Sequence, residues 1–330
     1  MKKNFISVLL PVYNAEKFIA ETLDSLIRQT NKNFEIIAVN DGSSDGSLKI
    51  LHEYADRDSR IVIIDQENQG LVKTLNTAAK QASGEFFARI DADDVALDRR
   101  FEFQLAAMQE DSRRVLVAGG FDVMNEDGEI LYHDAIPAHH RDILNAMQTR
   151  NPIAHGSVLM RRTAFESVGG YSGDCGPTED YELWTRLSKV GEIFALKQTI
   201  FRWRVNPNGI TSTKSEIMEK YMKQNFETFR NLHPFVVVSR ADLKKTMSHY
   251  LREDPLHGVA TKEHVLKDLA NASFVLIKQG RLLDAVSQLL IVASTGRTGL
   301  RLTRYRIAKA VKFHGNQALT KFFPGSTYSK

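Results

Sequence analysis

The stretch 34-FEIIAVNDGSSDGS-47 joins an apolar run to a polar loop and then to the start of a helix. Its first half, 34–40, is rich in apolar and β-branched residues and predicts a buried strand. Asp41-Gly-Ser-Ser-Asp follows, and residues of these types are typical of turns and helix starts. The stretch therefore predicts a strand, a polar loop and a helix in direct succession.

The same succession recurs along the first 120 residues. Strands are predicted at 5–10, 34–40, 61–65, 86–90 and 115–119, and helices near 15–30, 46–58, 70–82 and 99–110. Strands that alternate with helices form βαβ units, whose right-handed crossovers build a parallel sheet. We expect an α/β fold with a mostly parallel, Rossmann-like sheet flanked by helices.

The second half of the chain has a different pattern. Residues 150–212 look irregular and glycine-rich, with one helix near 179–190. From 213 onward the pattern is helical, at 213–231, 239–250, 261–279, 281–294 and 302–312. We therefore predict a first domain at 1–212 and an α-helical C-terminal region at 213–330.

Composition narrows the setting of the protein. Hydrophobic residues make up 42% and charged residues 25%, which is ordinary for a globular protein. Cys175 is the single cysteine, so no internal disulfide forms and a reducing compartment is expected. The apolar run near the N-terminus is short and lacks a cleavage site, so we interpret it as a strand. No run reaches the roughly 18 apolar residues of a membrane span. We expect a cytoplasmic protein.

The C-terminal tail is basic. After Asp284 the sequence holds no acidic residue but several arginines and lysines, interleaved with apolar side chains. One interpretation is an amphipathic helix within 297–321 that binds an anionic membrane surface, which makes the protein peripheral on the inner face of the cytoplasmic membrane. The other is a helix packed on the first domain. No nucleic-acid-binding motif is present, so no nucleic-acid partner is expected.

Polar clusters follow four of the predicted strands. In open α/β sheets, ligands bind beyond the carboxyl ends of the strands, so these clusters should line one crevice. Asp91 and Asp93 point the same way in an extended chain, while Ala92 points away. A crevice rich in carboxylates accepts phosphates when Mn²⁺ or Mg²⁺ lies between them. The alternative is that these acids only cap a helix that starts near Asp98.

Five motifs in this order resemble those of glycosyltransferase family 2. They are 7-SVLLPVYNAEKFIAETLDSLIRQT-30, 34-FEIIAVNDGSSDGS-47, 68-NQGLVKTLN-76, 89-RIDADD-94 and 179-EDYELWTRL-187. The resemblance covers roughly residues 5–210. It implies the GT-A fold and an inverting, nucleotide-sugar-dependent enzyme of the type that builds bacterial cell-surface polysaccharides.

The resemblance assigns nucleotide binding to residues of the first three motifs and to the D-x-D motif. Pro11 and Tyr13 would line the nucleobase pocket, with Tyr13 stacking on a uracil ring. Asp41 would bind the base or ribose, and Lys73 would approach the base or the diphosphate. The residues leave simpler roles open: Tyr13 as a packing aromatic, Asp41 as a helix cap before Gly46, and Lys73 as a solvated helix residue.

The D-x-D motif and the catalytic base follow from the same resemblance. Asp91-Ala92-Asp93 would bind the nucleotide sugar, with Asp91 toward the ribose and Asp93 toward the metal. Asp180 would be the general base. Glu179 and Asp180 alternatively serve only as first-turn acids that complement a helix dipole.

Several neighbours complete the predicted site. Candidates for acceptor or phosphate contacts are Asp94, Glu179, Trp184 and Arg204, with Trp184 favoured as core. Many family members carry a histidine near the metal where this sequence has Asn206. Asn206 therefore offers either a carbonyl oxygen to the cation or a turn before Pro207. His155 is expected to be a hydrogen-bonded structural histidine.

The predicted function is transfer of a sugar from a nucleotide-diphosphate sugar, with a UDP-sugar favoured. The acceptor is a hydroxyl of a glycan or lipid-linked saccharide, and Asp180 removes its proton in a metal-assisted single displacement. Two alternatives stay open. One is a non-catalytic sugar-nucleotide or glycan-binding subunit, and the other is a phosphotransferase with Asp91 as nucleophile.

Overall fold

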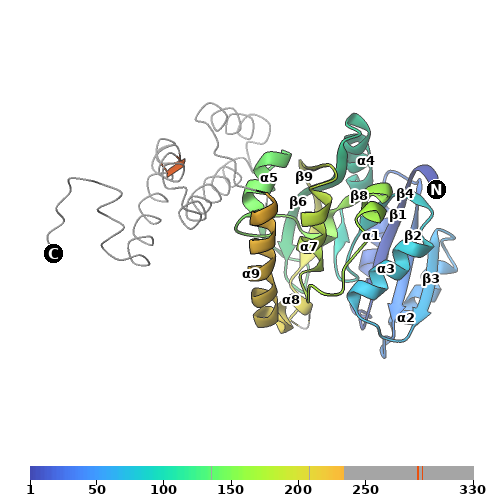
Figure 1. The fold of residues 1–330 in the computed structure, drawn as a ribbon. Coiled ribbons are helices and arrows are strands. Elements are labelled where there is room, and N and C mark those ends of the chain that lie inside the picture. Colours follow the sequence, from blue (N-terminus) through green and yellow to red (C-terminus); the bar gives the residue numbers. More distant parts are fainter. Residues whose placement is uncertain (135, 208, 234–287, 290–291, 293–330) are drawn as a thin grey trace, which may run out of the picture. The chain divides into compact units, whose positions relative to one another are not determined.

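A computed structural model describes residues 1–134, 136–207, 209–233, 288–289 and 292 (Figure 1). Residues 1–143 and 151–229 form one compact unit, which is described here by itself. Within the described residues, no helix combines the length and the apolar character that crossing a membrane requires. The predicted helices at 239–250, 261–279, 281–294 and 302–312, and the basic segment 297–321, lie essentially outside the described residues. The predicted boundary at residue 212 stays a prediction.

The first half of the compact unit has the predicted alternation. Its elements are β1 (Lys2–Val12), α1 (Ile19–Ile27), β2 (Phe34–Asp41), α2 (Ser47–Ala55), β3 (Ile61–Gln66), α3 (Leu71–Gln81), β4 (Gly84–Arg89), β5 (Val95–Ala96), α4 (Arg100–Glu110) and β6 (Arg114–Met124). Each strand predicted at 5–10, 34–40, 61–65, 86–90 and 115–119 is present. β1 and β6 are longer by five or six residues and β2 and β3 by one, while β4 begins two residues earlier and ends one residue earlier than predicted.

The second half contains more strand than the sequence indicated. Its elements are β7 (Ile130–Asp134), α5 (His140–Met147), the 3₁₀ turn η1 (His155–Ser157), β8 (Leu159–Arg161), α6 (Arg162–Ser167), α7 (Glu179–Leu187), β9 (Glu192–Arg204), α8 (Ile210–Thr213) and α9 (Ser215–Leu232). The prediction of an irregular 150–212 segment is therefore wrong for β9. Its polar triplet Lys197-Gln198-Thr199 coincides with shifts in the register against β6, which hides the strand periodicity.

The sheet order explains where a ligand crevice forms. The strands lie in the order β3-β2-β1-β4-β8-β6-β9-β5, with β7 beside β6. Pairings between the long strands are parallel, whereas the short β5, β7 and β8 pair antiparallel. The chain runs outward from β1 through β2 to β3 and then returns to β4 on the other side of β1. This reversal makes the carboxyl ends of β1 and β4 a topological switch point.

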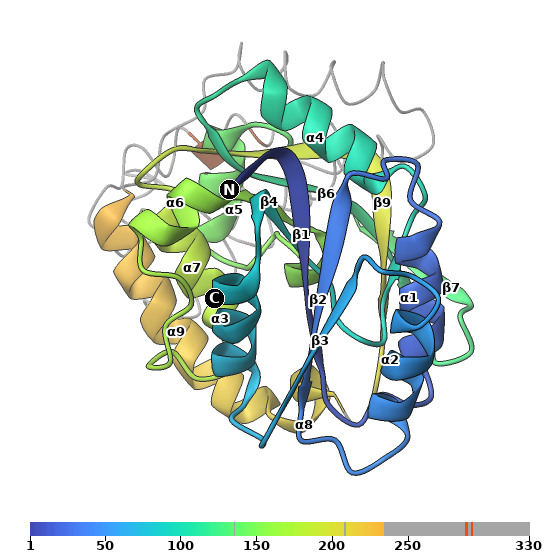
Figure 2. The same cartoon turned by 90° about the vertical axis from the view of Figure 1, so that its right-hand side faces the viewer.

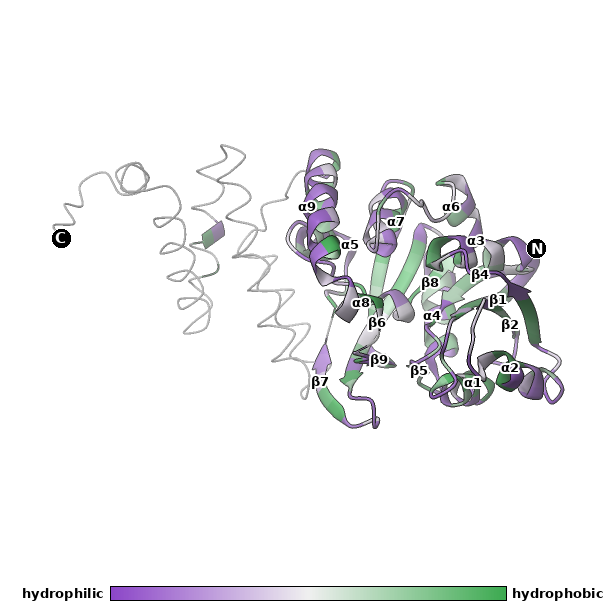
Figure 3. Cartoon of the chain, turned by 90° about the horizontal axis from the view of Figure 1, so that it is seen from below, coloured by the Kyte–Doolittle hydropathy of each residue, from purple (hydrophilic) through white to green (hydrophobic). Residues whose placement is uncertain are grey.

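Two layers of helices cover the sheet. Helices α1 and α2 lie on one face and α3 on the other (Figure 2). Alternate residues of β1 point to opposite faces of the sheet. Ile6, Val8 and Leu10 pack in the core that also contains residues of α1 and α4. Hydrophobic residues gather along the strands, whereas α9 is largely hydrophilic (Figure 3). The sheet is therefore buried on both faces, as parallel sheets usually are.

Candidate active site

The candidate site lies beyond the carboxyl ends of the neighbouring strands β2, β1 and β4. Pro11 is the residue before the last of β1, pairs with Val39 of β2 and is buried. Tyr13 is the first residue after β1 and is 56% exposed, so its ring is open to a ligand and the alternative of a packing aromatic loses support. Asn14 has a left-handed φ of 47°, a conformation that asparagine adopts more readily than most residues. Its Oδ1 accepts the Ser44 N–H at 2.8 Å, which ties the loop after β1 to the loop after β2.

Asp41 organises the loop after β3. Its carboxylate accepts hydrogen bonds from the backbone N–H of Gln69 and of Gly70, both at 2.9 Å, and from Gln66 Nε2 at 2.7 Å. Helix α2 has Gly46 at its N-cap, and Asp45 accepts the Ser47 N–H. Asp41 therefore does not cap α2. It fixes the segment that leads into α3, where the predicted nucleotide residue Lys73 lies exposed.

Arg89 is a site residue that sequence reasoning missed. It ends β4, its side chain is 2% exposed, and its Nη1 forms an ion pair with Asp91 Oδ2. Burial alone would lower the pKa of Arg89, but the nearby carboxylates, led by Asp91, raise it. The signal was present in the sequence, where an arginine directly follows the apolar run Phe86-Phe87-Ala88 and precedes the aspartates. Arg89 places one buried positive charge among several carboxylates.

The D-x-D residues lie in a turn and not in the extended chain that the prediction assumed, because the Asp94 N–H donates to the Asp91 carbonyl at 3.3 Å. Ala92 belongs to the hydrophobic core, while Asp91 and Asp93 keep partial exposure. Asn206 Nδ2 donates to Asp93 Oδ2 at 3.0 Å, and the Asn206 carbonyl accepts the Gly209 N–H at 3.0 Å. Asn206 thus forms the turn and orients Asp93 at the same time. Burial, and then the charge of Asp91, raises the pKa of Asp93.

Asp94 and Arg204 hold the loop after β4 in place. Asp94 is fully buried, and its Oδ1 accepts the Arg204 N–H at 2.8 Å. Burial raises the pKa of Asp94 well above its ordinary value, and Asp91 and Asp93 add to this. The Arg204 guanidinium donates to the carbonyls of Asp93 and Glu126, both at 2.8 Å, and to Glu21. Because Arg204 is 3% exposed, it acts in this arrangement as a structural clamp, which corrects the expected phosphate contact.

Asp98 plays no capping role in the structure. Helix α4 begins at Arg100 after the N-cap Arg99, and neither a side chain of the N-cap nor Asp98 caps it. The Asp98 carboxylate instead lies 3.7 Å from Arg28 Nε. The alternative that the acids after β4 merely cap a helix therefore finds no support, since the carboxylates of Asp91, Asp93 and Asp94 engage Arg89, Asn206 and Arg204 and not the start of α4.

The predicted base sits at the start of α7. Asp180 Oδ2 accepts a hydrogen bond from Asn151 Nδ2 at 2.6 Å, and Asp180 Oδ1 accepts the Tyr181 N–H at 2.6 Å. Burial and the charge of Glu179 raise the pKa of Asp180, against a lowering by His155. A raised pKa suits a general base, because it increases the affinity of the carboxylate for a proton near neutral pH. Asn151 is a second residue that sequence reasoning missed.

His155 lies between Tyr171, which follows α6, and Glu179 at the start of α7. Its Nε2 lies 2.8 Å from the Tyr171 hydroxyl, and its Nδ1 lies 3.6 Å from Glu179 Oε1. Burial lowers the pKa of His155 to about 3, so the ring is neutral at neutral pH. Its ring packs edge-on against Trp184, with centroids 5.8 Å apart, and Trp184 is fully buried. His155 is therefore structural, as expected, and Trp184 belongs to the core and not to an acceptor surface.

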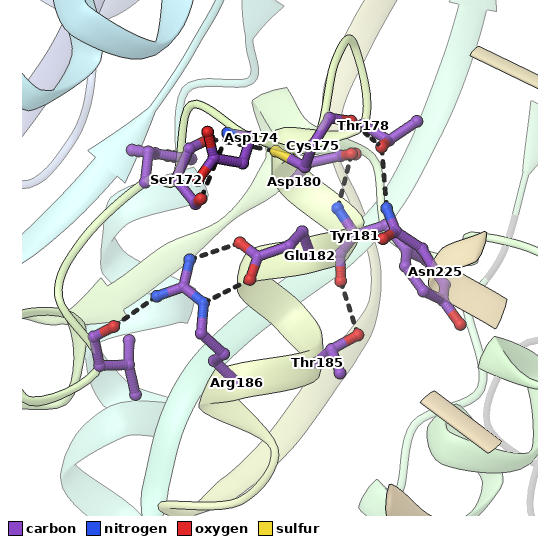
Figure 4. Close-up of polar contacts among 12 residues, drawn as sticks. Ser172, Asp174, Cys175, Thr178, Asp180, Tyr181, Glu182, Thr185, Arg186 and Asn225 are labelled. Carbon is purple, nitrogen blue, oxygen red and sulfur yellow. Dashed lines mark hydrogen bonds and ion pairs between the residues drawn. The ribbon is translucent and has the colours of Figure 1, made fainter. Parts of the chain in front are cut away.

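Helix α9 fixes the beginning of α7 (Figure 4). Asn225 Nδ2 donates to Thr178 Oγ1 at 2.8 Å, and Thr178 Oγ1 donates to the Cys175 carbonyl at 2.6 Å. Tyr181 packs against Phe226 and Phe229 of α9 with ring centroids 5.2 and 5.9 Å apart. The first turn of α7, which carries Asp180, is thus held from behind by a separate helix.

The carboxylates of Asp91 and Asp93 could hold a cation if a bound substrate supplied its other oxygen ligands. Among the described residues, no group of three or more histidine, cysteine, aspartate or glutamate side chains is arranged to hold a metal ion. Asp91 and Asp93 nevertheless lie together at the switch point, and the raised pKa of Asp93 marks crowded negative charge. Mg²⁺ and similar cations are often held by one or two carboxylates plus substrate phosphates. The residues therefore fit a cation whose remaining ligands come from a diphosphate.

Comparison with known proteins identifies the family. The Glycosyl transferase family 2 profile matches residues 7–169. An uncharacterized glycosyltransferase of Haemophilus influenzae is 30% identical over 243 residues, which cover 68% of this chain and 74% of that protein. The uncharacterized glycosyltransferase EpsJ of Bacillus subtilis is 30% identical over 233 residues, 67% of each chain.

Solved structures agree in fold. The crystal structure of S. aureus TarS 1-349 in complex with UDP superimposes with a TM-score of 0.55 at 19% identity, and covers 94% of this chain and 92% of that one. The complex of TarS 1-349 with UDP-GlcNAc gives 0.54 at 18% identity, over 98% and 93%. The predicted GT-A fold is confirmed. The chain therefore belongs to glycosyl transferase family 2 and is a sugar-transferring enzyme.

Proposed function

We propose that the protein transfers a sugar from a UDP-sugar to a hydroxyl of a glycan or lipid-linked saccharide, with inversion at the anomeric carbon. The observation that carries this proposal is the convergence of Asp180 with the D-x-D residues. The charges of Asp91, Asp180 and Arg89 all influence the pKa of the buried Tyr171 hydroxyl. The three side chains therefore lie near one hydroxyl, although Asp180 is far from the other two in sequence. The relatives of this fold that bind UDP and UDP-GlcNAc support the choice of donor.

The residues divide the reaction between them. Tyr13 and Asp41 flank the nucleoside, and Asp91 faces the ribose. Asp180 accepts the proton of the acceptor hydroxyl as its oxygen bonds to the anomeric carbon. The bond from that carbon to the diphosphate breaks in the same step, and UDP leaves. A single displacement of this kind inverts the configuration and needs no second carboxylate as nucleophile.

Asp93, with Asp91 beside it, would hold Mn²⁺ or Mg²⁺ against the donor diphosphate. When bound, the cation supplies positive charge to the leaving diphosphate. Asn206 keeps Asp93 turned toward that position through its 3.0 Å hydrogen bond. Arg89 limits the repulsion between the carboxylates before any ligand binds.

The acceptor and the location of the enzyme complete the proposal. A role in bacterial surface polysaccharide synthesis places the enzyme in the cytoplasm, peripheral on the inner face of the membrane. The basic segment 297–321 would bind anionic lipids there, and it lies outside the described residues. Asp94 and Glu179 border the site, and Glu179 is the closer of the two to the base, so it is the better candidate for an acceptor contact.

A donor panel tests the proposed activity. The purified protein is screened for thermal shift with UDP-, GDP- and dTDP-sugars, each with and without Mn²⁺, because a ligand that binds the native state raises apparent stability. Release of the nucleoside diphosphate is then followed with glycan and lipid-linked acceptors. We expect the UDP-sugars with Mn²⁺ to give the largest shift. If no donor binds and no diphosphate appears, the activity is wrong, and a phosphoryl group found on Asp91 would favour the phosphotransferase.

The pH dependence of transfer should report the base. Because the folded protein raises the pKa of Asp180, the fraction of active carboxylate falls as pH drops through that raised value. We expect the acid limb of kcat to lie above the ordinary aspartate range and activity to be retained toward pH 8. A profile measured with saturating donor and acceptor checks this. An acid limb at the ordinary aspartate pKa would argue against this base.

A further inference from the structure

Asn151 makes a side-chain hydrogen bond to Asp180 from another part of the chain. Its Nδ2 lies 2.6 Å from Asp180 Oδ2. The Asn151 Oδ1 accepts the Ile153 N–H at 3.3 Å, which defines which end of the amide faces the carboxylate. The amide is therefore oriented by its own loop before it meets Asp180.

The local sequence prepares this contact. Asn151 precedes Pro152, and a residue before proline is confined to extended backbone conformations. The two residues lead into η1, where His155 and Ser157 are anchored in the buried part of the site. Asn151 thus reaches Asp180 from a constrained segment and loses little conformational freedom on making the bond.

The two hydrogen bonds to Asp180 have a geometric consequence. An ionised carboxylate has about four acceptor positions on two oxygens. The Tyr181 N–H engages Oδ1 and Asn151 engages Oδ2, so the carboxylate plane cannot rotate freely. Each oxygen still has a lone pair for a substrate. We propose that Asn151 is a positioning residue that fixes the Asp180 carboxylate toward the acceptor hydroxyl, an inference that rests on Asp180 being the base.

The charges around Asp180 make this bond chemically significant. The ionisable groups that share its surroundings are His155 of η1, Glu179 of α7, Tyr171 after α6, Arg89 and Asp91 around β4, and Lys214 before α9. Glu179 disfavours ionisation of Asp180, and His155 is neutral at working pH. The Asn151 N–H therefore stabilises the ionised base together with the Tyr181 N–H, which has the larger effect, since a hydrogen bond to the charged form lowers its pKa.

Two substitutions separate positioning from packing. Asn151→Ala removes the amide, and we expect kcat to fall about 10- to 100-fold, as misplacement of a catalytic group does. Asn151→Asp keeps the size and the Ile153 contact but sets a carboxylate beside Asp180, and we expect it to be the slower variant. In both, the acid limb of kcat moves to higher pH, further in Asn151→Asp, so the loss of activity is greater at pH 6 than at pH 8.

The controls decide between outcomes. Asn33→Ala removes a comparable amide hydrogen bond, 2.8 Å long and remote from the site, and should keep wild-type kinetics. The UDP dissociation constant and the donor KM should stay within about twofold in both Asn151 variants, since the base does not bind the nucleotide. Wild-type kcat and pH profile in both variants would overturn the proposal, as would equal losses in kcat and UDP affinity without a shift of the acid limb. Activity retained in Asp180→Asn would instead overturn the assignment of the base.

Discussion

Asp180→Asn should lower kcat by about 10²- to 10⁴-fold, the usual contribution of a general base, with little change in donor binding. The substitution preserves the shape of the side chain, and its carbonyl oxygen can still accept the Asn151 N–H that now binds Oδ2 at 2.6 Å. What is lost is the capacity to accept a proton. Steady-state kinetics for transfer, with calorimetric titration of UDP, separate the two effects.

A matched variant on the same helix provides the control for Asp180→Asn. Glu182 forms an ion pair with Arg186 at 2.5 Å on α7, so Glu182→Gln should transfer sugar at close to the wild-type rate. A wild-type rate in Asp180→Asn would exclude Asp180 as the base. Glu179, which is buried and has a raised pKa, would then be the next carboxylate to replace.

Arg89→Met should lower the free energy of unfolding by about 3–5 kcal/mol at neutral pH, the cost of removing one partner of a buried ion pair. Arg89 is buried among Asp91, Asp93 and Asp94, and methionine fills its volume without its charge. The carboxylates are then left in a site that already raises the pKa of Asp93 and Asp94. Because Asp91 remains 34% exposed to solvent, the lower end of the range is the better expectation.

The sign of the pH effect tests the explanation. An acid whose folded pKa is raised above its unfolded value costs stability as pH rises through that interval, because the folded state must release its proton. Removal of Arg89 raises these folded pKa values further. The stability deficit of Arg89→Met should therefore be smaller at pH 5 than at pH 7.5 in urea unfolding. Arg99→Met, which removes an exposed pair with Glu102, should show almost no deficit at either pH. A deficit independent of pH would point to packing alone.

The sequence indicated the first half of the fold well for a physical reason. In β1 to β4 the apolar runs are short, dense and separated by clear helix patterns, and β1, β2 and β3 pair in chain order. β9 was not predicted because its pairing with β6 and β5 depends on residues far away in the sequence and is interrupted by a bulge. Gly119 permits that bulge, since a Cβ there would lie 2.6 Å from Ile200 Cδ1. No local pattern encodes such a close approach.

The site residues also differ in whether a pattern in the sequence indicates them. Asp91, Asp93 and Asp180 are predicted site residues because their types and order match a family pattern. Arg89 and Asn151 act through tertiary contacts, an ion pair with Asp91 and a hydrogen bond across 29 positions of the sequence. For Arg204 the residue type suggested a phosphate contact, but its burial and its backbone partners assign it to the framework.

The support that α9 gives to α7 sets a lower limit on how far the chain can be shortened. Truncation at residue 212, where the pattern of the sequence changes, would remove Asn225, Phe226 and Phe229 and leave the aromatic face of Tyr181 exposed to water. The loops after β1, β2 and β4, where we propose that UDP binds, would keep their own contacts. Such a fragment should bind the nucleotide yet transfer poorly, so the smallest catalytically complete piece ends beyond Phe229.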